Sequence, residues 1–311
     1  MRVIGVFNRD GGTFRTMDVA AFAQKAGTAF AAAGHDFEAR VVEGRELIAQ
    51  LRRAASEADL LLAGGGDGTI SAAAAAAHAK GVVLATLPAG TMNLFARSLG
   101  IPMGLDAALE ALAAGIERRV DIAVANGRPF IHQFSVGLHP KLVRLREALT
   151  YRSRFGKMVA SVRAAGGVLF NPPLFQAEII TPGSLERRRV AGISVSNNPL
   201  DEGHLPMADR LDRAVLGIYL MKPMTFGAML RLAFGLVRGK FRSLPEIIDK
   251  EAPEVTLRFP RWTSRARAVI DGELIPLEPR IEMKVLPGAL RVMVPRPPAT
   301  GGAQETLAAS A

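Results

Sequence analysis

A run of glycines broken by one aspartate, at residues 64–69, connects an apolar run at residues 60–63 to an alanine-rich stretch at residues 69–79. The apolar run predicts a buried strand, and the alanine-rich stretch predicts a helix. Glycines between them let the backbone take positive φ angles and approach a bound group closely. Free N–H groups at the start of a helix attract an anion. This order of strand, glycine loop and helix therefore predicts a phosphate-binding turn in an α/β fold.

Apolar runs and helical stretches alternate throughout residues 1–125. Strands are predicted at residues 3–7, 37–42, 60–63, 82–87 and 118–124, and helices at residues 18–33, 46–55, 69–79, 94–99 and 105–114. Alternation of this kind is typical of a mainly parallel sheet with helices on both faces. We therefore expect residues 1–125 to form an α/β nucleotide-binding domain.

Strands outnumber helices in residues 126–295. Strands are predicted at residues 130–136, 175–180, 190–196, 215–220, 255–259, 268–270, 280–286 and 290–294, helices at residues 141–165 and 226–238, and turns at residues 172–173, 182–183 and 287–288. This pattern predicts a β-rich antiparallel sandwich as the second domain, whose last strand can pack back on the first domain. Residues 296–311, rich in Pro, Gly and Ala, are expected to form a disordered tail.

The charge balance points to anionic partners. The chain has 39 Lys and Arg against 29 Asp and Glu, a net charge of +10, which favours nucleotides, nucleic acid or an acidic membrane surface. The absence of Cys excludes disulfides, zinc–thiolate sites and a Cys nucleophile. The five His residues lack metal-ligand spacing and are interpreted as structural or surface residues.

Targeting signals are not evident in the sequence. No apolar run reaches the ~18 residues that a membrane span needs. The first eight residues resemble a strand rather than a signal peptide. We therefore expect a cytoplasmic protein.

A second glycine-threonine turn lies at residues 88–97, again between a predicted strand and a helix. The Thr91 hydroxyl can donate to a phosphate oxygen, and Asn93 can cap the helix or hold the loop. Arg97, one turn further on, can meet a phosphate or a carboxylate, or form a surface ion pair.

Two further elements complete the predicted phosphate site. Asp67, within the first glycine run, would repel a phosphate, so it makes sense as a Mg²⁺ contact through water, a nucleotide-orienting group or a helix cap. After the first strand, Asn8 and the backbone of Gly11 and Gly12 could contact phosphate. A plain strand-to-helix turn is the alternative for this third segment.

The last motif is Asp271-Gly272-Glu273, directly after a predicted strand. Two carboxylates on a tight turn can align an acceptor hydroxyl and take its proton. Asp-Gly is also a common hairpin dipeptide, so an exposed turn is the alternative.

Together these four segments resemble the diacylglycerol kinase catalytic-domain family, which includes sphingosine, ceramide and bacterial lipid kinases. The glycine-aspartate-glycine-threonine run, the P-x-G-T-x-N-x-x-A-R pattern at residues 88–97 and the D-G-E at residues 271–273 carry the resemblance, which spans roughly residues 3–295. The segment after the first strand keeps the family's Asn and Gly but lacks its Pro. Where the family has a nucleotide-contacting Thr, this chain has Val41 or Val42.

The resemblance implies an ATP-dependent lipid kinase that transfers the γ-phosphoryl group to a hydroxyl of diacylglycerol, a sphingoid base or ceramide, with Mg²⁺. It implies Glu273 as general base, Asp271 as the group that orients the acceptor, and Asp67 as a Mg²⁺ or nucleotide contact. Arg97 would contact phosphate or substrate. Asp212 alone remains of an acidic pair that holds a structural Mg²⁺ in the family. The nucleotide would contact Asn8, Gly11, Gly12, Gly65, Gly66, Asp67, Gly68, Thr69, Gly90, Thr91 and Asn93.

A membrane contact is expected if the substrate is a lipid. Residues 226–237 place apolar side chains at helical spacing, namely Phe226, Met229, Leu230, Ala233, Phe234 and Val237. The flanking basic residues are Arg231, Arg238, Lys240 and Arg242, and a second basic set is Arg144, Arg146, Arg152, Arg154, Lys157 and Arg163. The segment predicts either an interfacial helix on the anionic inner face of the membrane or a helix that faces the core.

Three alternatives stay open. An NAD kinase has a related glycine loop, but the Asn-Glu pair that grips its substrate has only Asn197-Asn198-Pro199 as a counterpart here. A nucleic-acid-binding protein is disfavoured, because aromatic residues make up 6% of the chain and stacking platforms are scarce, so no nucleic acid partner is expected. An inactive kinase fold that senses nucleotide is the third.

Overall fold

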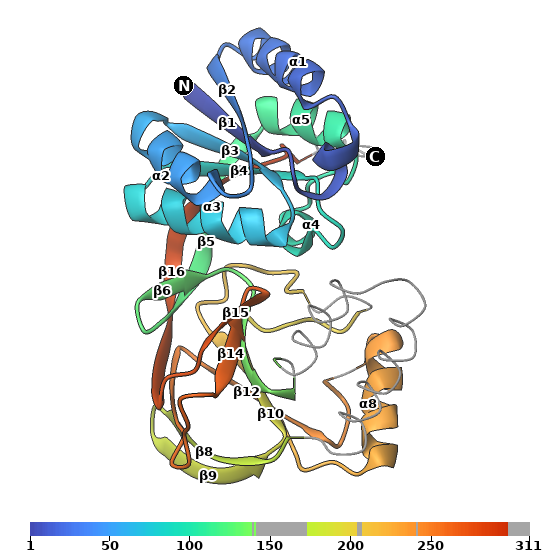
Figure 1. Cartoon of the computed structure of the whole chain (residues 1–311), viewed down its shortest axis with the longest axis vertical. Coiled ribbons are helices and arrows are strands. Elements are labelled where there is room, and N and C mark those ends of the chain that lie inside the picture. Colours follow the sequence, from blue (N-terminus) through green and yellow to red (C-terminus); the bar gives the residue numbers. More distant parts are fainter. Residues whose placement is uncertain (139, 141–172, 204–206, 241, 298–311) are drawn as a thin grey trace, which may run out of the picture.

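The computed structural model describes residues 1–138, 140, 173–203, 207–240 and 242–297. Figure 1 shows two lobes, one above the other, joined by the long strands β5 (Ile116–Ala125) and β16 (Arg280–Val294). The predicted helix at residues 141–165, with its basic set, and residues 298–311 of the predicted tail lie outside the described residues.

The first lobe is an α/β unit with a mainly parallel sheet, as predicted. Its strands are β1 (Arg2–Asn8), β2 (Asp36–Val42), β3 (Leu60–Gly65) and β4 (Val83–Pro88), in the order β2-β1-β3-β4, all parallel. Its helices are η1 (Gly12–Thr16), α1 (Val19–Ala32), α2 (Leu47–Glu57), α3 (Asp67–Lys80), α4 (Leu94–Ser98) and α5 (Leu105–Ala113). The end of β16 completes the sheet by pairing parallel with β4 and antiparallel with β5.

Local sequence explains these elements. Every residue of β3 and β4 is buried, because helices cover both faces of a parallel sheet. The buried face of α3 consists largely of alanines, including Ala73, Ala74 and Ala77, which let the helix pack closely. Asp18 caps α1 by accepting hydrogen bonds from two backbone N–H groups, and Gly81, at φ +68°, ends α3.

The second lobe contains two antiparallel sheets, as expected for the sandwich. Strands β8 (Phe175–Thr181), β9 (Ser184–Val190) and β13 (Glu254–Arg258) extend the first sheet from β16 in the order β16-β13-β8-β9. The six-stranded sheet has the order β12-β11-β10-β7-β14-β15, with bounds Ile247–Ala252, Leu216–Met221, Gly192–Asn197, Gln133–Gly137, Arg267–Ile270 and Glu273–Pro276. The short β6 (Arg128–Phe130) pairs with β5. Buried side chains such as Phe134, Val195 and Leu257 form the core between the sheets.

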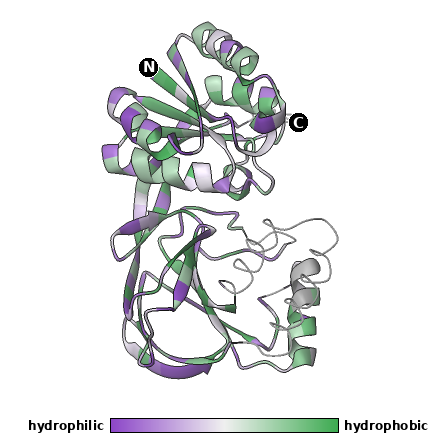
Figure 2. Cartoon of the chain, viewed as in Figure 1, coloured by the Kyte–Doolittle hydropathy of each residue, from purple (hydrophilic) through white to green (hydrophobic). Residues whose placement is uncertain are grey.

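Helix α8 (Phe226–Val237) packs on the second lobe through Ala228, Met229 and Leu232. Figure 2 shows apolar residues along much of α8 and hydrophilic residues along β9, which carries three consecutive arginines. Within the residues that the structure describes, no helix combines the length and apolarity needed to cross a membrane.

The structure corrects several predicted boundaries. Residues 280–294 form one strand, and the turn predicted at residues 287–288 is an irregularity in it, where Gly288 has φ +58°. The predicted strand at residues 130–136 is two strands, because the N–H groups of residues 131–133 bond to a carboxylate instead of a strand. Strands β9, β12 and β15 were missed, since their polar residues hide the apolar alternation.

Candidate active site

Three loops meet where β1, β3 and β4 end. The Asn8 side chain donates a 3.4 Å hydrogen bond to the hydroxyl of Thr69, which joins the loops after β1 and β3. The backbone N–H of Thr13 donates to the carbonyl of Ala89, 2.7 Å away, which joins the loops after β1 and β4. Ligands of open α/β sheets bind at this carboxyl edge.

Glycines allow these loops to touch. A Cβ at Gly90 would lie 2.5 Å from the Cα of Gly66, and a Cβ at Gly12, which has φ +52°, would lie 1.7 Å from the carbonyl oxygen of Ala89. A Cβ at Gly65 would lie 2.5 Å from the Thr69 hydroxyl oxygen. Gly68 differs, because a Cβ there would meet no atom within 4 Å. Loop packing therefore requires Gly12, Gly65 and Gly90, whereas Gly68 faces open space.

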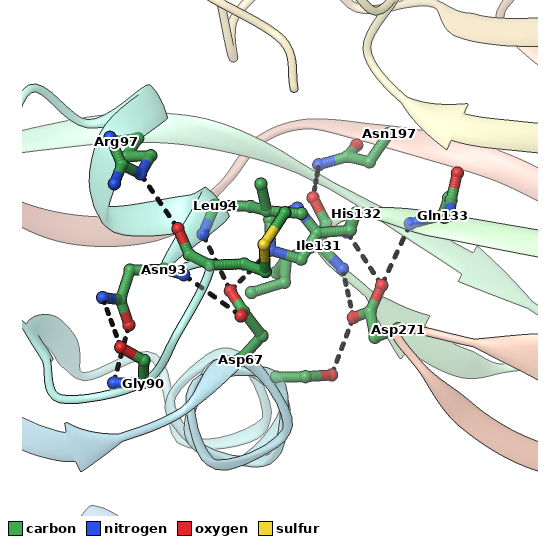
Figure 3. A network of polar contacts seen from close by, with 12 residues as sticks. Asp67, Gly90, Asn93, Leu94, Arg97, Ile131, His132, Gln133, Asn197 and Asp271 are labelled. Atoms are coloured by element: carbon green, nitrogen blue, oxygen red, sulfur yellow. Dashed lines mark hydrogen bonds and ion pairs between the residues drawn. The ribbon is translucent and has the colours of Figure 1, made fainter. Parts of the chain in front are cut away.

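Asp67 caps a neighbouring helix rather than its own (Figure 3). Its carboxylate accepts hydrogen bonds from the backbone N–H groups of Asn93, at 3.1 Å, and Leu94, at 2.8 Å, at the start of α4. These donors offset the negative charge that would otherwise repel a phosphate. The N-cap of α3 itself is Gly66, which has no capping side chain and leaves the first N–H groups of that helix to a ligand.

Asn93 holds the loop after β4 in shape. It has φ +52°, and its side chain accepts a hydrogen bond from the N–H of Gly90, at 2.8 Å, and donates to the carbonyls of Gly90 and Pro88. Arg97 is exposed, and its Nε donates to the carbonyl of Met92 in the same loop. Thr91 is exposed at the loop tip. Asn93 and Arg97 thus contribute to the site by fixing the loop that carries Thr91.

Asp271 ties the two lobes together. Its carboxylate accepts hydrogen bonds from the Ser71 hydroxyl on α3, at 2.7 Å, and from the N–H groups of Ile131, His132 and Gln133, at 2.9 to 3.0 Å. Asp271 and Gly272 both have positive φ, as in a type I′ hairpin turn between β14 and β15. Because four donors surround this carboxylate, its evident role is to position the hairpin.

Glu273, the other acid of the turn, is exposed. Its carboxylate lies 2.5 Å from a guanidinium nitrogen of Arg128, and the two side chains are 68% and 45% exposed. Arg128 follows the turn between β5 and β6, the point where the chain leaves the first lobe. The ion pair therefore joins the hairpin to the connection between the lobes.

One pocket brings together motifs that are two hundred residues apart. It has a volume of about 1020 Å³ and is lined by α2, by α3 from Gly68 onward, by Arg128 and by the hairpin residues Asp271 and Glu273. Apolar residues, among them Ile48, Ala72 and Ile270, line one part of it, and the basic residues are Arg52, Arg53, Lys80 and Arg128. Of the eleven predicted nucleotide contacts, the described lining includes only Gly68. The others lie at the loop edge outside it, namely Asn8, Gly11, Gly12, Gly65, Gly66, Asp67, Thr69, Gly90, Thr91 and Asn93.

His132 is a site residue that sequence reasoning missed. Its Nε2 lies 3.9 Å from the carboxylate of Asp67, and its ring meets Phe95 edge-on at 6.1 Å between centroids. Nε2 is buried without a hydrogen-bond partner among the described residues. Nothing in the spacing of the histidines marked this one, and the same holds for Ser71 and Arg128, whose partners are far away in the sequence.

The region of Asp212 does not resemble a metal site. The Asp212 carboxylate pairs with Arg210 at 3.1 Å, and the next residue, Arg213, pairs with Glu251. The nearby buried carboxylate of Asp121 accepts hydrogen bonds from the N–H groups of Ala214 and Gly288. Across the described residues, no three His, Cys, Asp or Glu side chains gather to hold a metal ion.

Comparisons with known proteins agree with this geometry. The family model of the diacylglycerol kinase catalytic domain matches residues 2–125. A Pseudomonas aeruginosa protein named "Probable lipid kinase YegS-like" is 32% identical over 259 residues, covering 76% of each chain. The diacylglycerol kinase of Bacillus subtilis is 26% identical over 70% of this chain and 72% of its own. The chain spans 60% of the length of a Synechocystis relative of uncharacterized function, with 26% identity.

The crystal structure of a diacylglycerol kinase from Bacillus anthracis has the same fold. It superposes with a TM-score of 0.68 at 18% identity and covers 94% of this chain and 96% of its own. The chain belongs to the diacylglycerol kinase catalytic-domain family. It is therefore a member of a family of kinases, which confirms the resemblance drawn from the four motifs.

Proposed function

We propose that the protein is a lipid kinase that transfers the γ-phosphoryl group of ATP to a hydroxyl of a membrane lipid. The observation that carries the proposal is that Gly68, at the start of α3, and the Asp271–Glu273 hairpin line one pocket. A phosphate-binding helix start and an exposed carboxylate from the other lobe thus face the same space. The named relatives support a lipid as the acceptor.

The pocket suits a nucleotide in both size and lining. Its apolar side chains, such as Ala72 on α3 and Ile48 on α2, can pack against a base. The N–H groups at the start of α3 would bind phosphate oxygens together with Arg128 and Arg52. Asn8, Gly11, Gly12, Gly90 and Thr91 would shape the loop edge beside these phosphates.

In the proposed transfer, the acceptor oxygen attacks the γ-phosphorus while the bond to the bridging oxygen of ADP breaks. The hydroxyl proton passes to the Glu273 carboxylate, which is exposed in the pocket. Asp271 positions that hairpin through its four hydrogen bonds. His132 and Asp67 lie side by side at the lobe boundary, where lobe closure would exclude water.

Mg²⁺ fits this site if it arrives with the nucleotide. Mg²⁺ usually keeps several waters and binds through one or two carboxylates plus substrate phosphates, so it needs no cluster of protein ligands. The Asp67 carboxylate has lone pairs beyond its two backbone hydrogen bonds and is 26% exposed. Asp67 is the residue that would hold the ion; Asp212, paired with Arg210, would not.

Helix α8 is the proposed membrane contact. The apolar residues at helical spacing in residues 226–237 lie on two faces of α8. Met229 is buried, whereas Leu230 and Phe234 are 49% and 56% exposed. Arg238 lies over the Phe234 ring at 4.2 Å, so a cation sits beside the exposed apolar face. An apolar face flanked by basic residues is typical of helices at an anionic membrane surface. Arg231 and Arg242, in contrast, are bound to Glu246 and Asp249.

Nothing in the site favours the alternatives. Asn197 and Asn198, the counterpart of the NAD kinase pair, are 2% and 0% exposed, each hydrogen-bonds to a backbone group, and neither lines the pocket. A protein that only senses nucleotide does not require a proton acceptor such as the exposed Glu273 in the pocket.

The test is phosphate transfer from labelled ATP to diacylglycerol, ceramide and a sphingoid base in mixed micelles. We expect one lipid to be labelled, and Glu273→Gln to lower kcat by about 10²- to 10⁴-fold while nucleotide affinity stays within about threefold. Asp67→Asn should weaken both binding and turnover.

Labelling of NAD instead of a lipid would move the protein to the NAD kinase class. Nucleotide binding without transfer to any acceptor would identify a sensor. Unchanged kcat in Glu273→Gln would exclude Glu273 as the proton acceptor.

A further inference from the structure

A second cavity, of about 610 Å³, lies in the second lobe away from the nucleotide pocket. It is bounded by the end of β7 at Gly137 and the start of β14 at Arg267, whereas the Asp271 turn lies at the other end of β14. Four residues of extended strand separate Arg267 from Asp271, roughly 13 Å. The cavity is therefore distinct from the site where the lobes meet.

Its lining combines arginines with aromatic rings. The basic residues are Arg189, Arg261, Arg265 and Arg267, and none of the described lining residues is acidic. Phe175 and Phe259, with ring centroids 6.0 Å apart, and Leu277 supply apolar surface beside them. Trp262, 40% exposed, stands at the same cavity.

Among the described residues, Arg189 does not share the ion pairing of the other two arginines of β9. Arg187 and Arg188 pair with Glu178 and Glu186, but Arg189 faces the neutral Gln176 across the strand pair. Within the described part of the chain, neither Arg189 nor Arg261 forms an ion pair with a carboxylate. Guanidinium groups without a carboxylate partner favour binding of an anion, above all a phosphate.

The residues of the cavity are held by a network of backbone bonds. The indole N–H of Trp262 donates to the carbonyl of Leu277 at 2.5 Å. The backbone N–H of Trp262 donates to the carbonyl of Phe259 at 3.0 Å. The Arg267 guanidinium donates to the carbonyls of Ser264 and Ala266. The connection from β13 to β14 is thus fixed before any ligand binds, which lowers the entropic cost of binding.

We propose that this cavity binds a phosphate ester attached to an apolar body, with the phosphate on Arg189 and Arg261 and the apolar part against Phe259 and Trp262. Such a ligand can come from a bilayer, as an anionic phospholipid, or from solution. The class also includes the phosphorylated product of a lipid kinase, a corollary that rests on the proposed function. Binding itself requires neither nucleotide nor turnover.

Trp262 is the single Trp of the chain, so tryptophan fluorescence reports on this cavity. The full protein, without nucleotide, is titrated with dihexanoyl phosphatidate below its micelle concentration, while Trp262 emission and acrylamide quenching are recorded. We expect a saturable blue shift and reduced quenching. Dihexanoyl phosphatidylcholine, whose phosphodiester charge is offset by its choline cation, and inorganic phosphate, which has no apolar part, should each bind at least tenfold more weakly.

One double variant and two control variants test the arginines. Arg189→Gln combined with Arg261→Gln should lower the affinity for dihexanoyl phosphatidate about tenfold or more, since each removes a charge-assisted bond. Arg187→Gln, on the same strand but paired with Glu178, is the matched control and should bind as the wild type does. Leu230→Ser, on α8, should likewise leave the response to the soluble lipid unchanged.

Three results would overturn the proposal. An equal response to inorganic phosphate would reduce the cavity to a simple anion site. Equal affinities of the double variant and the wild type would remove the arginines from the site. A response only to phosphatidate vesicles, never to the soluble lipid, would place Trp262 at a bilayer surface rather than in a ligand pocket. None of these outcomes depends on kinase activity, so they are separate from a failure of the phosphoryl-transfer assay.

Discussion

The hydroxyl of Ser71 donates a 2.7 Å hydrogen bond to the carboxylate of Asp271, a residue two hundred positions later in the chain. Ser71 lies on the helix that begins with the glycine loop, and Asp271 lies on the hairpin that carries Glu273. One bond thus couples the phosphate-binding lobe to the lobe that supplies the proposed proton acceptor.

Replacing Asp271 should affect stability and activity together. In Asp271→Asn, an amide group would face backbone N–H donors that now bond to a carboxylate, and we expect a loss of about 2–3 kcal/mol in the free energy of unfolding. Ser71→Ala removes one donor only and should cost about 1 kcal/mol. Urea unfolding measures both, with Thr28→Ala on α1 as control. Equal stability of Asp271→Asn and wild type would show that the hairpin is held by other contacts.

Gly90→Ala and Gly68→Ala should separate loop packing from nucleotide binding. A methyl group at position 90 would overlap the Cα of Gly66, so the loops must move apart and the melting temperature should fall. A methyl group at position 68 meets no protein atom within 4 Å, yet Gly68 lines the proposed nucleotide pocket. Gly68→Ala should therefore keep the wild-type melting temperature and weaken nucleotide binding, as measured by calorimetry. A drop in melting temperature for Gly68→Ala would contradict this division.

Arg128→Gln should raise the KM for ATP about tenfold. Arg128 lines the nucleotide pocket and pairs with Glu273, so its guanidinium can transfer to the nucleotide phosphates. Arg187→Gln removes a comparable surface ion pair at a distance from the pocket and should leave KM unchanged. An unchanged KM in Arg128→Gln would restrict Arg128 to orienting Glu273.

Stability should depend on pH through Glu117, which joins β5 to β16. The Arg291 guanidinium forms two 2.7 Å bonds to this carboxyl and holds its pKa below the ordinary value of 4.5. The pair's contribution is thus complete above the unfolded-state pKa and is lost as pH falls through the lowered folded-state value. Because both side chains are about one-third exposed, the contribution should be less than ~1 kcal/mol.

Glu117→Gln should therefore be less stable than wild type at pH 7, and the difference should shrink progressively as the pH falls below 4.5, as measured by urea unfolding. A difference between the two proteins that does not change with pH would assign the effect of Glu117 to packing rather than to its charge.

Local sequence predicted most of the first lobe, because its apolar runs and helix signals are strong in β3, α3 and β4. The second lobe was less readable. Strand β9 has the sequence SLERRRV, whose polar side chains give no apolar face, and its place in the sheet follows from pairing with β8. The Pro-Gly pair at residues 287–288 signals a turn locally, yet pairing with β5 on both sides carries the strand through it.

The candidate site was predictable where motifs are local and hidden where contacts are long-range. The glycine run and the Asp-Gly-Glu turn were recognisable from their local sequence. Only the structure distinguishes the roles of their acidic residues. Asp67 caps α4, Asp271 holds the lobes together, and Glu273 remains exposed. His132 and Ser71 became visible as site residues only through neighbours far away in the sequence.

The passage of β16 through both lobes sets the order in which the protein can be completed. In the described part of the chain, the edge of β4 pairs with β16 at Leu84 and Val292, so the nucleotide-binding sheet stays unfinished until residue 292 has been synthesised. The segment that matches the family model, residues 2–125, would emerge from the ribosome with an open, apolar strand edge. During translation, the first lobe to be made is thus the last to be completed, and its strand edge stays open to other pairing until then.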